Sequence, residues 1–284
     1  MPLNVLLTGA NSGFGLLTAE KFARAGHRVH AGLRNPAKGA ALEALRAEGL
    51  PVTLVSLDVT DPASITAAVA SASQAAPIDA LINNAGFEVR GPVESLDDDL
   101  LKRQFDTNVL GVVRLIRAVA PIMRERRAGT IVNLSSVAGH ISAPFSGAYS
   151  ASKHAVEALS EALWFELRPF GVRVVLIEPG AFETQFGANI IDAPGFDAAS
   201  PYAPLAARFR AAMEGFRSGP PQEPKEIADL IFDAVTATDP ALRHLAGDDA
   251  RMLVPLYRSL PFEGFAGAMI GQLGLADVLK PPAT

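Results

Sequence analysis

Tyr149 and Lys153 have the residue types and the spacing that proton transfer requires. They lie four positions apart where a helix is predicted to begin, so their side chains share one helical face. A phenol has an unperturbed pKa of about 10, and a neighbouring ammonium favours the phenolate by about 1.4 kcal/mol for each pKa unit. A pKa lower by about two or three would make Tyr149 a usable acid–base group. Such a pair alone is typical of a protein surface, so its context decides.

Two further polar residues supply that context. Ser136 closely follows a short aliphatic run over residues 130–134, which places its hydroxyl at the carboxyl edge of a predicted sheet. There it could donate a hydrogen bond to a substrate carbonyl that gains negative charge. Asn108 lies inside a helix predicted over residues 100–126, where asparagine is an indifferent helix former. It indicates either a functional role or a helix bend.

A glycine-rich turn near the N-terminus predicts a dinucleotide site. It joins an aliphatic run over residues 3–7 to a helix that begins near Leu16. Glycines at such a junction let backbone N–H groups approach a pyrophosphate, and the helix N-terminus favours negative charge. An ordinary strand-to-helix turn is the alternative. The residues predicted to bind the cofactor here are Gly9, Asn11, Ser12, Gly13, Phe14 and Gly15.

The residues after the second predicted strand favour NADP over NAD. A site for NAD usually places an acidic side chain there to accept a hydrogen bond from the ribose 2′-hydroxyl. This sequence has no Asp or Glu from Lys21 to Leu42, and Arg34 follows the strand instead. A guanidinium suits a 2′-phosphate, so we predict NADP as the cofactor. A solvated loop arginine is the alternative.

The ends of the next two strands complete the predicted cofactor site. Asp58 and Val59 follow the third strand, where the acid could accept from the adenine amino group. Alternatively, Asp58 or Asp61 caps the helix that begins near Pro62. Three residues that follow the fourth strand are predicted to let the backbone pack against adenosine, namely Asn84, Ala85 and Gly86. By themselves they could equally form a turn.

The elements that must position these residues alternate along the chain. Aliphatic runs of strand length occupy residues 3–7, 28–32, 52–57, 80–82, 130–134, 172–177 and 243–246. Stretches with helical periodicity lie at 16–25, 37–48, 64–75, 100–126, 150–168 and 224–235. This alternation predicts an α/β fold, a single Rossmann-type doubly wound domain over residues 1–284 with about seven parallel strands flanked by helices. Residues 181–220 interrupt the pattern after a strand end, where open parallel sheets bind ligands, and are predicted to form a substrate lid.

Composition excludes several other classes. The chain has no cysteine, and its net charge of −5 includes no block of like charge, so we expect no nucleic-acid or membrane partner. The five histidines lack zinc-type spacing with carboxylates, so no metal site is predicted. The first nineteen residues carry no charged side chain and no basic leader, which is unlike a signal peptide or a membrane span. We expect a soluble cytoplasmic protein.

Together these motifs resemble the short-chain dehydrogenase/reductase family over nearly the whole chain, and most closely its hydroxysteroid and retinol dehydrogenase-like members. The resemblance implies that Tyr149 is the acid–base group and that Lys153 binds the nicotinamide ribose and lowers the tyrosine pKa. It implies that Ser136 orients the carbonyl and that Asn108 holds a water in a proton relay. It adds to the cofactor site the residues Pro179, Gly180 and Thr184, the last at the nicotinamide carboxamide. The basic residue that some NADP-preferring members carry before the middle glycine is absent, since Ser12 stands there.

The implied activity is an NADP(H)-dependent oxidoreductase that interconverts a carbonyl and a secondary or primary alcohol. Segments after the fourth, fifth and sixth strands should line the substrate pocket, and they are mostly apolar, which favours a small hydrophobic carbonyl or alcohol. The predicted substrate-binding residues are Phe87, Val89, Ser136, Val137, His140, Phe145, Tyr149, Phe182 and Phe186.

Two other interpretations remain, and one assembly is expected. A non-catalytic NADP-binding sensor would keep the glycine turn. Residues 150–153 also match the Ser-x-x-Lys of penicillin-binding acyl enzymes, but the supporting Ser-Asp-Asn and Lys-Thr-Gly motifs are absent.

The helices at 100–126 and 150–168 carry apolar residues on more than one face, which predicts a homodimer or homotetramer.

Overall fold

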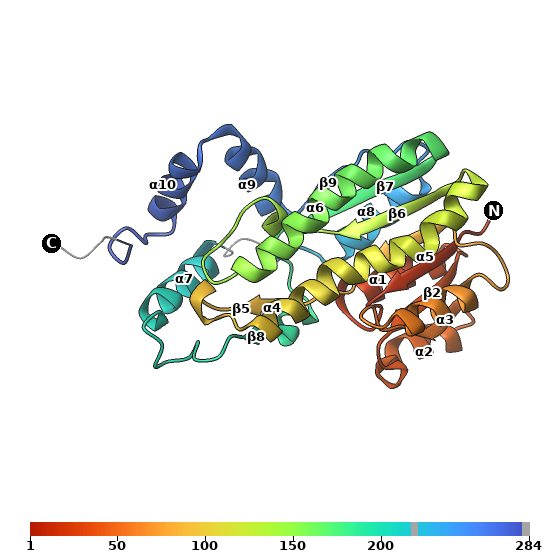
Figure 1. Cartoon of the computed structure of the whole chain (residues 1–284), viewed down its shortest axis with the longest axis horizontal. Helices are drawn as coiled ribbons and strands as arrows, with labels where there is room; N and C mark the ends of the chain where they lie inside the picture. Colours follow the sequence, from red (N-terminus) through yellow and green to blue (C-terminus); the bar gives the residue numbers. More distant parts are fainter. Residues whose placement is uncertain (217–220, 280–284) are drawn as a thin grey trace.

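A seven-stranded parallel sheet forms the centre of the protein (Figure 1). The computed structural model describes residues 1–216 and 221–279. In spatial order the strands are β3 (Val52–Ser56), β2 (Arg28–Leu33), β1 (Asn4–Thr8), β4 (Ala80–Asn83), β6 (Gly129–Leu134), β7 (Val172–Pro179) and β9 (Arg243–Ala246). All neighbours run parallel, with Leu7 opposite Ile82 in the middle of the sheet. The predicted doubly wound fold is therefore confirmed.

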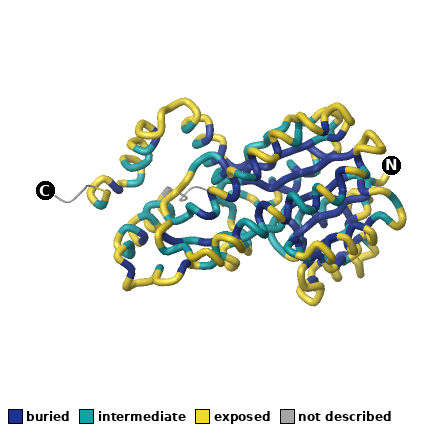
Figure 2. The backbone as a smooth tube through the Cα atoms, in the orientation of Figure 1, coloured by how far each residue is buried: buried dark blue, intermediate teal, exposed yellow. Residues whose placement is uncertain are grey.

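Helices cover both faces of this sheet and bury it. One hydrophobic core packs α1 (Gly13–Arg24), α2 (Ala40–Ala47) and α8 (Lys225–Thr236) against one face. The other core packs α3 (Pro62–Ala72), α5 (Gly111–Arg126) and α6 (Gly147–Leu167) against the opposite face. Every residue of β1, β4 and β6 is buried, as expected for parallel strands covered on both sides, and Figure 2 shows these strands in dark blue.

The helix predicted over residues 100–126 is interrupted near its start. It consists of α4 (Asp98–Phe105), a π-helical turn (Asp106–Leu110) and α5. The π turn contains Asn108, at the position where the sequence indicated a possible helix bend. Such turns insert one extra residue into a helix and are frequent at functional sites. Gly111 follows the turn and begins α5, and a Cβ there would approach Val59 Cγ2 to 2.8 Å.

The remaining segments gather beyond the carboxyl ends of the strands. The predicted lid contains β8 (Ile191–Asp192), which pairs with β5 (Val89–Arg90) in a separate two-stranded parallel sheet, and α7 (Ala203–Phe216). Residues 217–220 of that prediction lie outside the described residues. The apolar tail forms α9 (Asp248–Ser259) and α10 (Phe262–Gln272). Figure 1 shows α7 and α10 at the end of the molecule away from the N-terminus.

Short 3₁₀ turns complete the described elements, at Pro36–Lys38, Val93–Ser95, Val137–Gly139, Arg168–Phe170 and Gln185–Asn189. Across residues 1–216 and 221–279, none of the helices combines the length and the apolar character needed to cross a bilayer.

Candidate active site

A cavity of about 1520 Å³ lies at the carboxyl edge of the sheet and collects most of the predicted site residues. Its wall begins at the glycine turn, passes the ends of the strands and reaches the lid and the C-terminal helices. The predicted residues that line it are Gly9, Asn11, Ser12, Gly13, Phe14, Arg34, Asp58, Val59, Asn84, Ala85, Gly86, Phe87, Ser136, Val137, Tyr149, Lys153, Pro179, Gly180, Phe182, Thr184 and Phe186. Polar residues at the strand ends and apolar residues of the loops therefore line the same cavity.

The glycine turn is held open by a neighbouring strand end. Asn84 Nδ2 donates hydrogen bonds to the carbonyl oxygens of Thr8 and Gly9, at 2.9 and 3.0 Å. Gly9 and Gly13 have φ values of +66° and +53°, which favour glycine. A Cβ on Gly9 would come within 2.9 Å of the Ala85 backbone. Because Ser12, Gly13 and Phe14 line the cavity where α1 begins, this turn fits the pyrophosphate of a dinucleotide.

Gly15 is predicted to bind the cofactor, but it does not line the cavity and is closely packed. A Cβ on Gly15 would lie 2.3 Å from the Gly9 carbonyl oxygen and 2.7 Å from Asn84 Nδ2. The third glycine of the turn is therefore needed for close contact between α1 and the turn itself. This is a contact that the spacing of glycines alone does not distinguish from ligand binding.

The predicted adenosine side of the cavity is basic. Arg34 and Lys38 both line it, just beyond the end of β2. Neither side chain has a hydrogen bond or an ion pair within the part of the chain that the structure describes. Asp58 also lines the cavity and accepts hydrogen bonds from the Thr60 backbone and hydroxyl, at 2.9 and 2.7 Å. Asp61 is the residue that caps α3, through the Ala63 N–H at 2.9 Å.

Ser136, Tyr149 and Lys153 meet at the centre of the cavity wall. Ser136 closely follows β6, and Tyr149 and Lys153 occupy successive turns of α6. The Lys153 ammonium lies 5.6 Å from the centroid of the Tyr149 ring, and it donates a hydrogen bond of 2.7 Å to the Leu134 carbonyl oxygen. A serine hydroxyl, a phenol and an ammonium therefore line one space, which can bind and protonate a carbonyl oxygen.

The protonation of this group differs from the sequence prediction. Tyr149 is half-buried at the cavity wall, and this burial raises the pKa of its phenol above the usual value, while hydrogen bonding with Ser136 lowers it. Burial also lowers the pKa of Lys153 to about 8. The Tyr149 pKa thus lies above its usual value and not below it as predicted, because burial outweighs the hydrogen bond with Ser136. The neutral phenol, a proton donor, is the favoured form.

Asn108 does not reach the cavity surface. It is buried in the π turn, where its side-chain oxygen accepts from the Phe87 N–H at 3.2 Å. Its Nδ2 donates to the Phe87 carbonyl at 3.0 Å and to the Ser152 hydroxyl at 3.2 Å. Asn108 therefore ties the cavity-lining backbone of Phe87 to helix α6, and its predicted place in a proton relay is untested.

Three predicted substrate residues do not line the cavity, so the structure does not bring them together with the others. Val89 is fully buried in β5, where its N–H donates to Gln104 Oε1 at 2.6 Å. His140 turns towards the sheet and bonds Glu178 Oε1 through Nε2 at 3.0 Å. The Phe145 ring packs within the lid, 5.0 Å from the Phe196 ring, with Tyr202 and Phe209 nearby. In each case a partner distant in sequence decides the orientation.

The C-terminal helices supply cavity residues that the sequence analysis missed. They are apolar side chains of α9, α10 and the following turn, namely Met252, Leu253, Phe262, Phe265, Ala266, Met269, Ile270, Leu273, Leu275 and Leu279. From α7 the lid adds Phe209 and Met213. The spacing of three and four residues from Phe262 to Leu273 was the available signal, since it marks one apolar helical face.

Comparison with known proteins agrees with this geometry. A family model described as short chain dehydrogenase matches residues 3–194. An uncharacterized oxidoreductase of Bacillus subtilis, YusZ, is 37% identical over 263 residues, which cover 90% of this chain and 92% of that protein. The 17-beta-hydroxysteroid dehydrogenase type 1 of Mus musculus is 35% identical over 254 residues, which cover 86% and 74%. The chain therefore belongs to the short-chain dehydrogenase/reductase family of oxidoreductases.

Solved structures share the fold and differ in their cofactor. A short-chain dehydrogenase from Streptomyces avermitilis has a TM-score of 0.81 and 31% identity, and the match covers 99% of this chain and 100% of that one. One from Burkholderia phymatum in complex with NAD has a TM-score of 0.76 and 31% identity, with coverage of 90% and 92%. An actinorhodin polyketide ketoreductase variant with NADPH has a TM-score of 0.76 and 29% identity, with coverage of 88% and 97%. Nicotinamide cofactors of both kinds occur among the structural neighbours.

Proposed function

We propose that this protein is an NADP(H)-dependent oxidoreductase that interconverts a carbonyl and an alcohol on a hydrophobic substrate, with Tyr149 as the acid–base group. The observation that carries the proposal is that Ser136, Tyr149 and Lys153 line the same cavity as the glycine turn. A bound nicotinamide would supply or accept the hydride. The turn from Gly9 to Gly13 would hold its pyrophosphate, and Lys153 its nicotinamide ribose.

The side chains of this protein would manage the proton and the oxygen of the substrate. In the reduction direction the neutral Tyr149 phenol donates its proton to the carbonyl oxygen. The Ser136 hydroxyl donates a hydrogen bond to that oxygen, and the Lys153 ammonium stabilises the phenolate that remains. Because these groups are fixed and removed from bulk water, their charges act more strongly than they would in solvent. The oxidation direction uses the same groups in reverse.

The proposed preference for NADP rests on the basic side of the cavity. Arg34 and Lys38 line it, and neither has an acidic partner among the residues that the structure describes; no Asp or Glu occurs between Lys21 and Leu42. A guanidinium can bond a 2′-phosphate through two N–H groups, whereas the ribose hydroxyl of NAD calls for an acceptor.

A hydrophobic substrate is favoured by the lining between Tyr149 and the C-terminal helices. Phe87, Phe182 and Phe186 line the same cavity as Tyr149, and the Phe186 ring lies 5.8 Å from the tyrosine ring. Beyond them the walls from α7 and α10 are apolar. A relative named a hydroxysteroid dehydrogenase is consistent with such a substrate.

A screen of carbonyl substrates tests the proposal. Wild-type protein is incubated with NADPH or NADH and a panel of hydrophobic ketones and aldehydes, and cofactor absorbance is followed. We expect oxidation of NADPH, and we expect Tyr149→Phe to abolish turnover while NADPH still binds. NADPH binding without turnover on any carbonyl would instead favour the alternative, a non-catalytic NADP-binding sensor.

The assembly, domain extent and location of the protein are also proposed. Members of this family bind small substrates and often form oligomers. Leu110, Leu159 and Phe165 are exposed apolar residues on the π turn and α6, and they support a homodimer or homotetramer. Light scattering at micromolar concentration tests this, since a monomer would refute it. A single domain over residues 1–284 and a cytoplasmic location stay predictions.

A further inference from the structure

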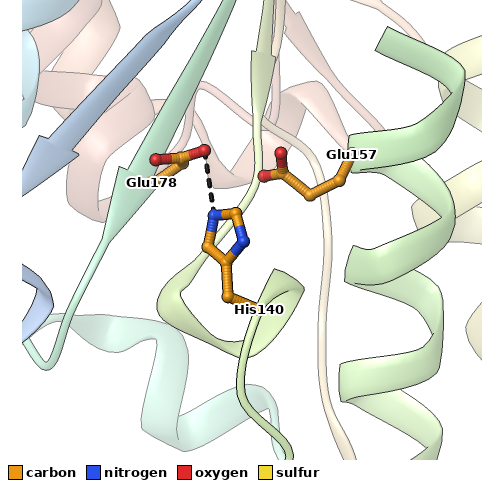
Figure 3. Close-up of side chains that lie close together, drawn as sticks. All are labelled: His140, Glu157 and Glu178. Carbon is orange, nitrogen blue, oxygen red and sulfur yellow. Dashed lines mark hydrogen bonds and ion pairs between the residues drawn. The ribbon is translucent and has the colours of Figure 1, made fainter. Parts of the chain in front are cut away.

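Four ionisable side chains form a buried cluster behind Lys153, on the side away from Tyr149. This charge cluster consists of His140, Glu157, Glu178 and Arg243. Figure 3 shows His140 and Glu178 joined by a hydrogen bond of 3.0 Å, with the Glu157 carboxyl group facing them. Arg243 from the edge strand β9 bonds Glu157 at 3.0 Å and Glu178 at 3.1 Å. Both carboxyl groups are almost fully buried.

The cluster is held by a guanidinium and is not arranged as a metal site. Ligand atoms of His140, Glu157 and Glu178 lie within 4.8 Å of one another, close enough for a cation. Arg243 already bonds both carboxyl groups and supplies the positive charge that a metal ion would bring. The other imidazole nitrogen of His140 faces Arg258, at 3.5 Å. A second cation at this point would meet like charge.

Glu157 connects this cluster to the active site. It follows Lys153 by one turn of α6, so the two side chains share a helical face. Lys153 bonds the carbonyl of Leu134, and Glu157 faces the hydroxyl of the next residue, Ser135. Ser135 Oγ and Glu157 Oε1 are both buried, and neither has a hydrogen-bond partner among the described residues. Lys153 therefore bonds one of the two residues that immediately precede Ser136, and Glu157 faces the other.

A glycine leaves room for this contact. The Cβ that Gly139 lacks would lie 2.7 Å from Ser135 Oγ and 2.9 Å from Glu157 Cγ. A side chain at 139 would force Ser135 or Glu157 to shift. The carboxyl group thus lies beside the segment that joins β6 to Ser136.

We propose that Glu157 is a positioning residue for Lys153: its carboxylate, held ionised by Arg243, keeps the lysine charged and seated at the end of β6. The role in catalysis rests on the proposed function, whereas the charge state of Lys153 can be measured without it. Burial lowers the pKa of Lys153 to about 8, and the negative charge of Glu157 raises it.

The charges around Glu157 explain why it needs Arg243. Burial and the neighbouring Glu178 raise the pKa of the Glu157 carboxyl, while Ser135, His140 and Arg243 lower it. Besides these groups, Lys153 and Glu161 face it from its own helix, and Glu161 also bonds Arg243, at 2.6 Å. Without the guanidinium, two carboxylates would remain together in a buried place.

The first test measures the pKa of Lys153 directly, in the full-length protein without cofactor. Lysine labelled with ¹³C at Cε is followed by NMR as pH rises, and Lys153→Met assigns the signal. We expect Glu157→Gln to lower the Lys153 pKa by about one unit or more, because a negative charge one helical turn away is lost. We expect Arg243→Met to lower it as well, because Glu157 without the guanidinium takes up a proton and its negative charge is lost. Glu161→Gln is the matched control, since this exposed carboxylate bonds the same arginine and is screened by water.

The direction of the shift distinguishes positioning from loss of structure. A loosened core would expose Lys153 to water and raise its pKa towards the ordinary value, whereas loss of the Glu157 charge lowers it in both variants. Coincident titrations of wild type, Glu157→Gln and Glu161→Gln would overturn the proposal. If Glu157→Gln does not fold, the downward shift in Arg243→Met decides, and its absence refutes the inference.

The second test uses turnover of the holoenzyme on a carbonyl found in the screen. We expect the rate of reduction to fall on the alkaline side at a pH about one unit lower in Glu157→Gln than in wild type or Glu161→Gln. An inactive wild type would contradict the proposed function and leave the NMR result standing. An active wild type with unchanged alkaline limbs in both variants would contradict the inference alone.

Discussion

Replacement of Arg34 by alanine should weaken binding of NADPH and leave binding of NADH nearly unchanged. Arg34 lies just beyond the end of β2, lines the cavity and has no acidic partner among the described residues. If it meets the 2′-phosphate, the variant loses one charge-assisted interaction that NADH never makes. Lys38, four residues further along the chain, also lines the cavity and would partly compensate for the lost positive charge.

The size of the effect follows from the exposure of the site. A hydrogen bond to a charged group contributes about 1.5–3 kcal/mol, and the lower end applies because Arg34 is exposed to water. We therefore expect the Kd for NADPH to rise by about tenfold to thirtyfold. The difference between wild type and variant should shrink at high salt, because exposed charges are screened. Arg34→Asp should go further and favour NADH, since a carboxylate can accept from the ribose hydroxyl.

Titration of nicotinamide fluorescence with both cofactors measures these affinities. Arg28→Ala is a matched control, because Arg28 is an exposed arginine at the other end of β2 and does not line the cavity. Equal losses of NADPH and NADH affinity in Arg34→Ala would show that the arginine acts on the fold or on the shared part of the cofactor. An unchanged NADPH affinity would remove the basis for the proposed preference.

Three further predictions concern packing, charge and the substrate wall. Gly15→Ala should lower the free energy of unfolding by about 1–3 kcal/mol and abolish cofactor binding, because a Cβ would meet the Gly9 carbonyl at 2.3 Å. Gly267→Ala is the control, since Gly267 has open space around it, and chemical denaturation measures the stability of both variants. Lys153→Met should be more stable than wild type at neutral pH. Because the pKa of Lys153 is about 8 in the folded protein and 10.5 in the unfolded chain, the free energy of unfolding of wild type should rise by up to about 3 kcal/mol relative to the variant between these pH values. A constant difference between the two denaturation midpoints would contradict the burial of a charged lysine. Met269→Ala should raise KM for a hydrophobic carbonyl by about fivefold to thirtyfold while the Kd of NADPH stays the same, because Met269 lines the apolar wall of the cavity. An unchanged KM would place the substrate away from α10.

The sheet and the glycine turn could be predicted because their signals are local. A strand buried on both faces is a short aliphatic run whatever its neighbours are, as residues 130–134 illustrate. The turn at Gly9 and Gly13 needs positive φ values, which the residue type itself reports. The pairing of Tyr149 with Lys153 likewise depends only on helical periodicity.

What could not be predicted depends on partners far along the chain. Val89 is buried because β5 pairs with β8, more than a hundred residues later, and His140 turns inward because Glu178 accepts its hydrogen bond. The pKa of Tyr149 depends on how much water the folded cavity excludes, a quantity absent from the sequence. The second wall of the cavity was missed because the apolar tail could be assigned no place relative to the sheet.

Because of the π turn at Asp106–Leu110, the orientation of α4 relative to α5 depends on the exact number of residues between them. It holds one residue more than regular winding would accommodate, so deletion of a single amino acid there would restore an unbroken α-helix. The segment before the deletion would then rotate by about 100° relative to the segment after it. Gln104, which bonds the backbone at Phe87 and Val89, would swing away from both. The shortened chain would thus have more regular secondary structure and would still lose the contacts that hold Phe87 at the cavity wall.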